Sequence, residues 1–90
     1  MEPASSRPLN SKDLILITDN PADARFIGSP VDYIIFDGLT EVADEKSREI
    51  RIVFMDVKKG TGSLTRTQRV IKKAVENKAV SWETLKIADT

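Results

Sequence analysis

Apolar and polar residues alternate in two stretches of the chain, and this period of two predicts β-strands. Both stretches are rich in β-branched and aromatic residues: residues 31–37 read VDYIIFD and residues 49–58 read EIRIVFMDVK. Apolar side chains occupy both faces of the first stretch, so we expect an interior strand there. The polar residues 38–47 between the two stretches predict an acidic hairpin loop that makes the strands neighbours.

Four other segments complete the expected topology. The apolar run at residues 14–17 predicts a short strand, and residues 21–26 predict a single helical turn capped by Asn20. Residues 64–79 predict the main helix, because apolar residues recur there at spacings of three and four. Alternation at residues 80–87 predicts a closing strand.

These elements predict an α/β fold, a single small domain in which one main amphipathic helix packs on a mixed central sheet. The domain is expected over residues 13–90, after a flexible lead at residues 1–12 that holds two prolines and three serines. A chain of 90 residues buries a modest core, so dimerisation is expected to add stability.

The composition of the chain limits the cellular compartments and the types of catalytic residue that can be expected. No apolar run approaches the roughly 18 residues of a membrane span, and residues 1–10 are polar and proline-broken, so a cytoplasmic protein is expected. The chain has neither Cys nor His, which excludes thiol nucleophiles, disulfides, thiolate zinc sites and histidine bases. Catalysis would therefore use carboxylates, Lys, Arg, hydroxyls or Gln, most naturally around a hard cation with oxygen ligands.

The formal net charge is zero, but the charges are unevenly distributed along the chain. Residues 37–49 hold five acids against two cations, whereas residues 58–78 hold seven cations against the acid Glu76. A basic C-terminal half fits a surface that faces phosphate, or simply a solvated helix face. On the first interpretation, the residues expected to contact nucleic acid are Lys59, Arg66, Arg69, Lys72 and Lys73.

The candidate chemistry lies where the two predicted strands would meet. If they pair as a hairpin, the start of one lies beside the end of the other, which brings Asp32 close to Asp56 and Lys58. Two adjacent carboxylates repel unless a cation lies between them, and magnesium or manganese would take oxygen ligands from both. Lys58 would then assist the attacking water or neutralise charge on a bound phosphate. The alternative is a partly exposed salt bridge, worth about 0–1 kcal/mol.

Gln68 also has two interpretations. Thr65 and Gln68 fit the S/T-x-x-E/Q capping box, in which the glutamine bonds back to the first turn of the helix. Gln68 also interrupts the apolar stripe of the helix, which would direct it toward the sheet and the acids. Trp82 is expected to be a core or edge anchor rather than a platform for base stacking. The glycines at residues 60–62 lack the Lys-Ser/Thr that completes a P-loop.

An ordered set of motifs adds a family resemblance. GSPVD from Gly28, FDGL from Phe36, DVK from Asp56 and LTRTQR from Leu64 resemble the PD-(D/E)XK nuclease superfamily. They are most similar to the small endonucleases related to archaeal Holliday junction resolvases, over about residues 21–87. This resemblance implies a restriction-endonuclease-like core, DNA as substrate, Mg2+ or Mn2+ as cofactor and a homodimer.

The resemblance also implies roles for single residues. Asp32 and Asp56 would bind the metal, Lys58 would be the catalytic lysine, and Gln68 would orient the lysine or the water. Ser29 lies in the segment where resolvases place a serine near the scissile phosphate.

Two features depart from the family pattern. Close relatives usually have Glu at the position of Asp56, which has the shorter side chain. Active resolvases also have an acid on a helix before the first strand, and here only Glu2 precedes Asp13, so this helix is expected to be reduced or missing. The sequence predicts a metal-dependent endonuclease-like domain that hydrolyses phosphodiester bonds in duplex or branched DNA. The alternatives are a catalytically weak or inactive DNA-binding module and a structural or interaction domain of the same fold.

Overall fold

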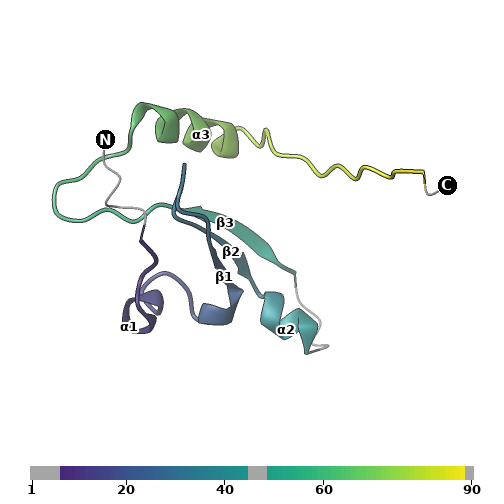
Figure 1. Cartoon of the computed structure of the whole chain (residues 1–90), viewed down its shortest axis with the longest axis horizontal. Coiled ribbons are helices and arrows are strands. Elements are labelled where there is room, and N and C mark those ends of the chain that lie inside the picture. Colours follow the sequence, from purple (N-terminus) through teal and green to yellow (C-terminus); the bar gives the residue numbers. More distant parts are fainter. Residues whose placement is uncertain (1–6, 45–48, 89–90) are drawn as a thin grey trace.

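The fold is built around a three-stranded sheet, seen in a computed structural model that describes residues 7–44 and 49–88 (Figure 1). The strands β1 (Ala24–Phe26), β2 (Tyr33–Asp37) and β3 (Arg51–Met55) lie in the order β1-β2-β3. Both neighbouring pairs are antiparallel. The expected small α/β domain is confirmed, but its sheet, within the described ranges, is antiparallel and not mixed.

The two strands expected from the alternating pattern are confirmed as β2 and β3. They pair from Tyr33 opposite Met55 at one end to Asp37 opposite Arg51 at the other. Their connection was expected to be a loop, yet its first part forms the short helix α2 (Leu39–Ala43). The last part of that predicted loop, residues 45–48, lies outside the described residues.

Helix α2 is held by a residue from a distant segment. Its N-terminus begins after Gly38, whose φ of 104° lies in the left-handed region that glycine tolerates. Asp23, which is 3% exposed, accepts hydrogen bonds from the amides of Gly38 (3.1 Å) and Thr40 (2.9 Å). These bonds satisfy N–H groups that the helix itself leaves unpaired. The sequence analysis missed this role of Asp23.

The N-terminal region corrects one predicted element. Residues 14–17 are not a strand, because the helix α1 (Ser11–Leu14) is followed by a hydrogen-bonded turn that reaches Thr18. The side chain of Asn10 caps α1 by accepting a bond from the Asp13 amide at 2.9 Å. An apolar run of four residues fits a strand or a helical turn equally well, and here the cap favours the turn.

The next segment confirms one prediction and adds a strand. The single turn expected after Asn20 is the 3₁₀ helix η2 (Pro21–Asp23), with the Asn20 side chain accepting from the Ala22 amide at 3.0 Å. The turn was expected to continue to residue 26, but residues 24–26 form β1 and pair with β2. Pairing with a neighbouring strand outweighs the weak local helical preference here.

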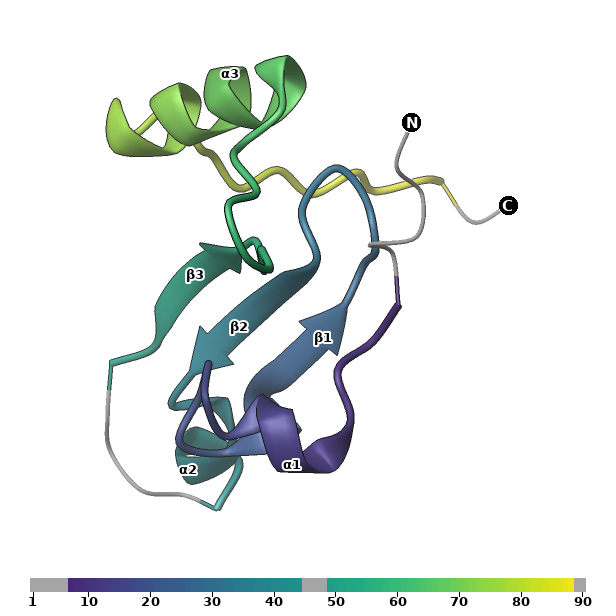
Figure 2. The same cartoon turned by 90° about the vertical axis from the view of Figure 1, so that its left-hand side faces the viewer.

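The buried core lies between the sheet and the N-terminal region. Val31, Tyr33 and Ile35 are the buried apolar residues of the described chain. The ring of Tyr33 packs edge-on against Phe26 with centroids 5.4 Å apart, and its hydroxyl accepts a bond from the Leu9 amide at 2.6 Å. Figure 2 shows the sheet with α1 in front of it. The chain therefore contacts the domain from Leu9 onward, within the lead expected at residues 1–12.

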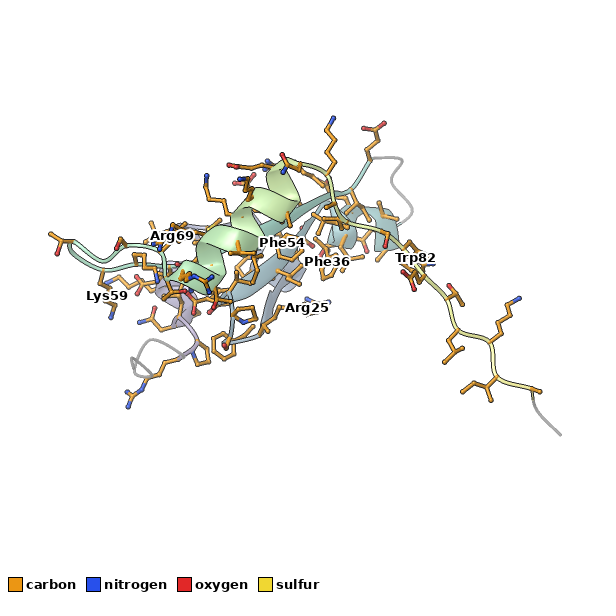
Figure 3. All side chains as sticks on the ribbon, turned by 90° about the horizontal axis from the view of Figure 1, so that it is seen from above. Arg25, Phe36, Phe54, Lys59, Arg69 and Trp82 are labelled. Atoms are coloured by element: carbon orange, nitrogen blue, oxygen red, sulfur yellow. The ribbon has the colours of Figure 1, made fainter. Side chains whose placement is uncertain are left out.

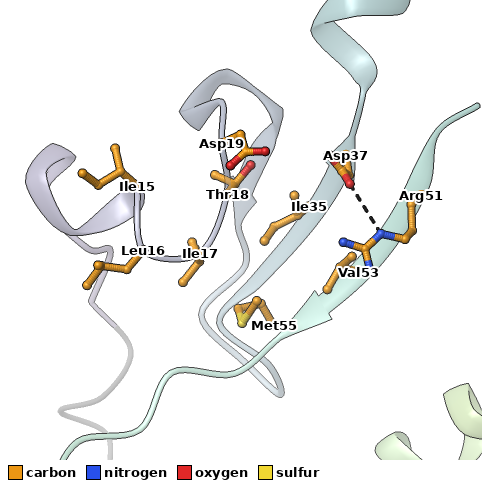
Figure 4. A pocket seen from close by; sticks show the side chains of 10 residues that line it. All are labelled: Ile15, Leu16, Ile17, Thr18, Asp19, Ile35, Asp37, Arg51, Val53 and Met55. Atoms are coloured by element: carbon orange, nitrogen blue, oxygen red, sulfur yellow. Dashed lines mark hydrogen bonds and ion pairs between the residues drawn. The ribbon is translucent and has the colours of Figure 1, made fainter. Parts of the chain in front are cut away.

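A shallow pocket opens on this same face of the sheet (Figure 4). The turn at residues 15–19 forms one wall, and Val53 and Met55 of β3 line the other side. An ion pair of 3.4 Å between Arg51 and Asp37 lies at its rim.

The predicted main helix is confirmed as α3 (Arg66–Glu76). It lies above the sheet in Figure 1, and Figure 3 shows Phe36 and Phe54 beside it when viewed from above. None of its residues is fully buried.

The predicted closing strand is not formed. Residues 79–88 contain neither helix nor strand, and all of them are exposed, Trp82 to 89%. Trp82 is therefore not the core or edge anchor that was expected. A strand that follows a helix and returns to the same sheet would run parallel to β3, so its absence explains why the described sheet is not mixed.

Candidate active site

The two acids lie just beyond the paired part of β2 and β3. The register ends at Tyr33 opposite Met55, and Asp32 and Asp56 are the next residues outward on the two strands. The Asp32 amide donates to the Met55 carbonyl at 3.1 Å, which holds the two strands together at this end. The two carboxyl groups lie close enough to interact directly. The structure thus brings together the two acids that the sequence placed in one site.

Lys58 completes this cluster. Its Nζ lies 3.1 Å from Asp56 Oδ2 and donates a hydrogen bond to Gln68 Oε1 at 3.0 Å. The side chain of Asp56 is 12% exposed and that of Lys58 is 29% exposed. Water therefore screens this ion pair less than it would a pair on an open surface.

Gln68 joins the cluster to the first turn of α3. Its Oε1 accepts from Lys58 and from the Thr65 amide (3.0 Å), while its Nε2 donates to Asp56 Oδ1 (3.0 Å) and to the Pro30 carbonyl (2.8 Å). These four bonds use the full hydrogen-bonding capacity of an amide. They also fix its orientation, since a flip would set its N–H groups against the Thr65 N–H.

Gln68 therefore caps the helix and contacts Asp56 at the same time. The capping box is complete, because the Gln68 amide also donates to Thr65 Oγ1 at 3.1 Å. The same side chain contacts both Asp56 and Lys58. Folding of the helix N-terminus and placement of the lysine thus depend on one residue.

Asp32 is the electrostatically strained member of the cluster. It is 6% exposed, and burial raises the pKa of its carboxyl above the usual 3.8. The neighbouring Asp56 carboxylate raises this pKa further, through repulsion and by a hydrogen bond to the protonated form. The Val57 amide, which donates to Asp32 Oδ2 at 2.7 Å, and the charge of Lys58 act in the opposite direction.

Asp56 has one oxygen with an incomplete set of contacts. Oδ1 accepts from Gln68, but the buried Oδ2 has no well-directed hydrogen bond, and its contact is the ion pair with Lys58. A buried carboxylate oxygen without hydrogen bonds is costly. It is also a suitable donor for a cation.

The residues of the cluster fit a hard divalent cation in part. Asp32 and Asp56 offer carboxylate oxygens, and Mg2+ commonly uses one or two protein carboxylates together with waters and substrate phosphate. Among residues 7–44 and 49–88, no group of three or more acids gathers into a site. The described α-helix before β1, α1, spans four residues and carries Asp13, which joins no such group.

Ser29, the serine expected near the phosphate, is exposed in the loop before β2. This loop touches the cluster through the carbonyl of Pro30, which accepts from Gln68, rather than through Ser29. The sequence analysis missed the main-chain groups of Pro30 and Val57, because main-chain atoms act regardless of residue type and give no sequence signal.

The predicted DNA-contacting cations lie around the cluster in different settings. Figure 3 shows Lys59 on the loop before α3 and Arg69 on the helix. Arg69 is turned about 100° around α3 from Gln68, away from the cluster, and its guanidinium donates to the Leu64 carbonyl at 2.8 Å. Lys72 forms an ion pair with Glu76 at 2.6 Å. Arg66 and Lys73 share the outward face with Arg69.

The chain matches one known protein family. The model of the family "endonuclease related to archaeal Holliday junction resolvase" matches residues 13–87, and the chain belongs to this family. The match covers every residue of the cluster described above. No curated protein and no solved structure matches the chain. No described helix has both the length and the apolar character needed to cross a membrane.

Proposed function

We propose that the chain is a divalent-metal-dependent endonuclease domain that hydrolyses phosphodiester bonds in branched DNA, acting in the cytoplasm as a homodimer. The observation that carries this proposal is the pair of adjacent acids, buried Asp32 and half-buried Asp56, beside the ammonium group of Lys58. Two carboxylates that face each other destabilise a fold unless a cation joins them. Membership in the endonuclease family supports DNA as the substrate class.

Asp32 and Asp56 would hold Mg2+ or Mn2+ between them. When bound, such an ion supplies Lewis acidity toward a phosphate oxygen and lowers the pKa of water. Lys58 Nζ is placed to donate a hydrogen bond to the phosphate as negative charge builds on its oxygens. Gln68 holds that nitrogen in place at 3.0 Å, and its bond to Asp56 Oδ1 fixes the orientation of the carboxylate.

The test is cleavage of a synthetic four-way junction and of supercoiled plasmid in the presence of Mn2+ or Mg2+. Cleavage should stop on addition of EDTA. Lys58→Ala should reduce the rate by about 10²–10⁴-fold, the usual range for a group that acts on the transition state. Arg51→Ala is the matched control, because it removes a cation from the other end of the same strand pair. Equal loss of activity in both variants would refute the role of Lys58.

A second candidate function is a DNA-binding module that does not cleave. It is favoured by the two-carboxylate set, since no third acid joins it among the described residues. Metal-independent binding of the junction without cleavage would identify this module. A structural or interaction domain would bind no nucleic acid even at low salt, where phosphate contacts are strongest.

A further inference from the structure

The segment that follows α3 is extended, and its apolar side chains are exposed to solvent. Trp82 is 89% exposed, Leu85 83% and Ile87 79%. A side-chain hydrogen bond from Trp82 Nε1 to Thr84 Oγ1, at 2.9 Å, stays within the segment. The family match runs to residue 87, so this segment belongs to the domain and is not an appendage.

The end of α3 directs this segment away from its own sheet. The Ala79 amide bonds to the Ala74 carbonyl at 2.9 Å and the Lys78 amide to the Val75 carbonyl at 3.0 Å, the two bonds of a Schellman motif. Lys78 has the left-handed conformation that this cap requires, with a φ of 61°. Figure 1 shows the chain continuing in the direction of the helix axis beyond this cap.

Strand β3 has an unpaired edge that fits such a segment. The order β1-β2-β3 leaves one side of β3 without a neighbour in the described sheet. Apolar side chains near this edge are also partly open, with Ile50 39%, Ile52 57% and Phe54 36% exposed. An unpaired edge with exposed apolar residues is a template for a further strand.

We propose that residues 80–87 add as a strand to the β3 edge of a second copy of this chain, in a reciprocal exchange that forms a two-fold dimer. Eight residues span about 26 Å, which exceeds the length of the five-residue strand β3. The alternation of the segment would place Trp82 on one face of the partner's sheet and Leu85 and Ile87 on the other.

A second copy is the occupant that the observations favour. Every copy has both a donor segment and an acceptor edge, so one two-fold axis satisfies both at once. The formal net charge of zero adds no long-range repulsion between copies. This inference does not depend on catalysis, because neither the segment nor the β3 edge includes the acids or Lys58.

The first test is the mass of the full chain in solution, measured by light scattering over a range of concentrations. We expect twice the 10.0 kDa of one chain. The double variant Leu85→Asp, Ile87→Asp should raise the dissociation constant at least 10-fold and leave the circular dichroism of the domain unchanged. Val70→Asp, at a residue of α3 that is 60% exposed, is the matched control and should leave the dimer intact. A monomeric full chain, or a dimer lost only in Val70→Asp, would overturn the proposal.

The second test locates the segment. The chain has no cysteine, so Ile52→Cys and Leu85→Cys introduce unique thiols. The two single variants are unfolded together, refolded and treated with a flexible bismaleimide, which tolerates uncertainty in strand register. We expect a cross-linked dimer that contains one copy of each variant, whereas Lys12→Cys with Leu85→Cys should give none. In a chain with both cysteines, a cross-link formed solely within one chain would show that the segment closes on its own sheet, and would overturn the exchange.

Discussion

The two ends of the β2–β3 pair have opposite electrostatics. At one end Asp37 faces Arg51, a pair of opposite charge with a separation of 3.4 Å. At the other end Asp32 and Asp56, the next residues outward on the two strands, form an interacting pair of like charge. Opposite charges across a strand pair stabilise it by roughly 0.2–1 kcal/mol, whereas like charges destabilise it.

The two ends also differ in how their charged side chains are held. The Arg51 side chain is 76% exposed, so the Asp37–Arg51 pair is a surface contact of small energetic value. At the other end Asp32 is buried and Asp56 is half-buried, and both are held in place by Val57, Gln68 and Lys58 despite their repulsion. Under the proposed function, a bound metal ion would compensate for this repulsion.

The largest expected effect is on metal binding. Asp32→Asn and Asp56→Asn each remove one of two carboxylate donors, so each should weaken Mn2+ binding by at least about 100-fold, since a lost charge–charge contact of this kind is worth several kcal/mol. Isothermal titration with Mn2+ measures this change. The control Asp37→Asn removes a carboxylate from the other end and should leave the titration unchanged. Binding that survives in both site variants would show that the opposed acids do not form the metal site.

Next in size is the effect of Gln68→Ala. This change removes four side-chain hydrogen bonds, including the cap of α3, and should lower the free energy of unfolding by about 1–3 kcal/mol. It should also reduce DNA cleavage more than Thr65→Ala, which removes one bond of the capping box and leaves the bonds to Lys58 and Asp56. Denaturation and cleavage rates measure the two effects. Equal cleavage by both variants would mean that Gln68 serves the helix alone.

A smaller effect concerns stability against pH in the presence of EDTA. The pKa of Asp32 is raised in the folded chain, so the folded state binds this proton more tightly than the unfolded state, whose pKa is near 3.8. The free energy of unfolding should therefore fall as pH rises from 3.8 through the raised pKa, and the full penalty remains at neutral pH. Asp32→Asn removes this penalty, so it should be more stable than the natural chain at pH 7 and lose that advantage in acid. Thermal melts at both pH values would contradict this if the variant were the less stable chain at pH 7.

The smallest expected effect is at the opposite end. Arg51→Ala breaks an exposed pair and should change the free energy of unfolding by about 0–1 kcal/mol, less as salt is added. Urea denaturation at two salt concentrations measures this. A loss above that range would mean that both ends of the strand pair contribute to the fold, and the contrast drawn above would weaken.

The sequence predicted those parts of the fold in which a long periodic pattern fits a single type of secondary structure. Alternation identified β2 and β3, helical spacing identified α3, and their hairpin order was enough to bring Asp32 beside Asp56. Short segments were predicted less well. The apolar run at residues 14–17 fits a strand and a turn equally, and β1 has three residues, too few for any period to show.

Other parts of the structure depend on contacts that residue types do not reveal. Asp23 bonds to Gly38 across 15 positions of the chain, and Gln68 bonds to the Pro30 carbonyl across 38. The strand expected at residues 80–87 has a strand-like sequence, but the cap at the end of α3 directs the segment away from the free edge of β3 in its own chain. Alternation predicts that a segment can form a strand, but it does not predict which edge the segment pairs with.

The capping box of α3 has a consequence for heat inactivation. Helix ends unwind more readily than helix centres, because fewer hydrogen bonds hold them. Unwinding of the first turn would release Gln68 from Thr65 and remove the support of the lysine ammonium, while β2 and β3 remained paired. On warming, cleavage activity should therefore be lost some degrees below the temperature at which the strands separate. Cooling should restore this activity.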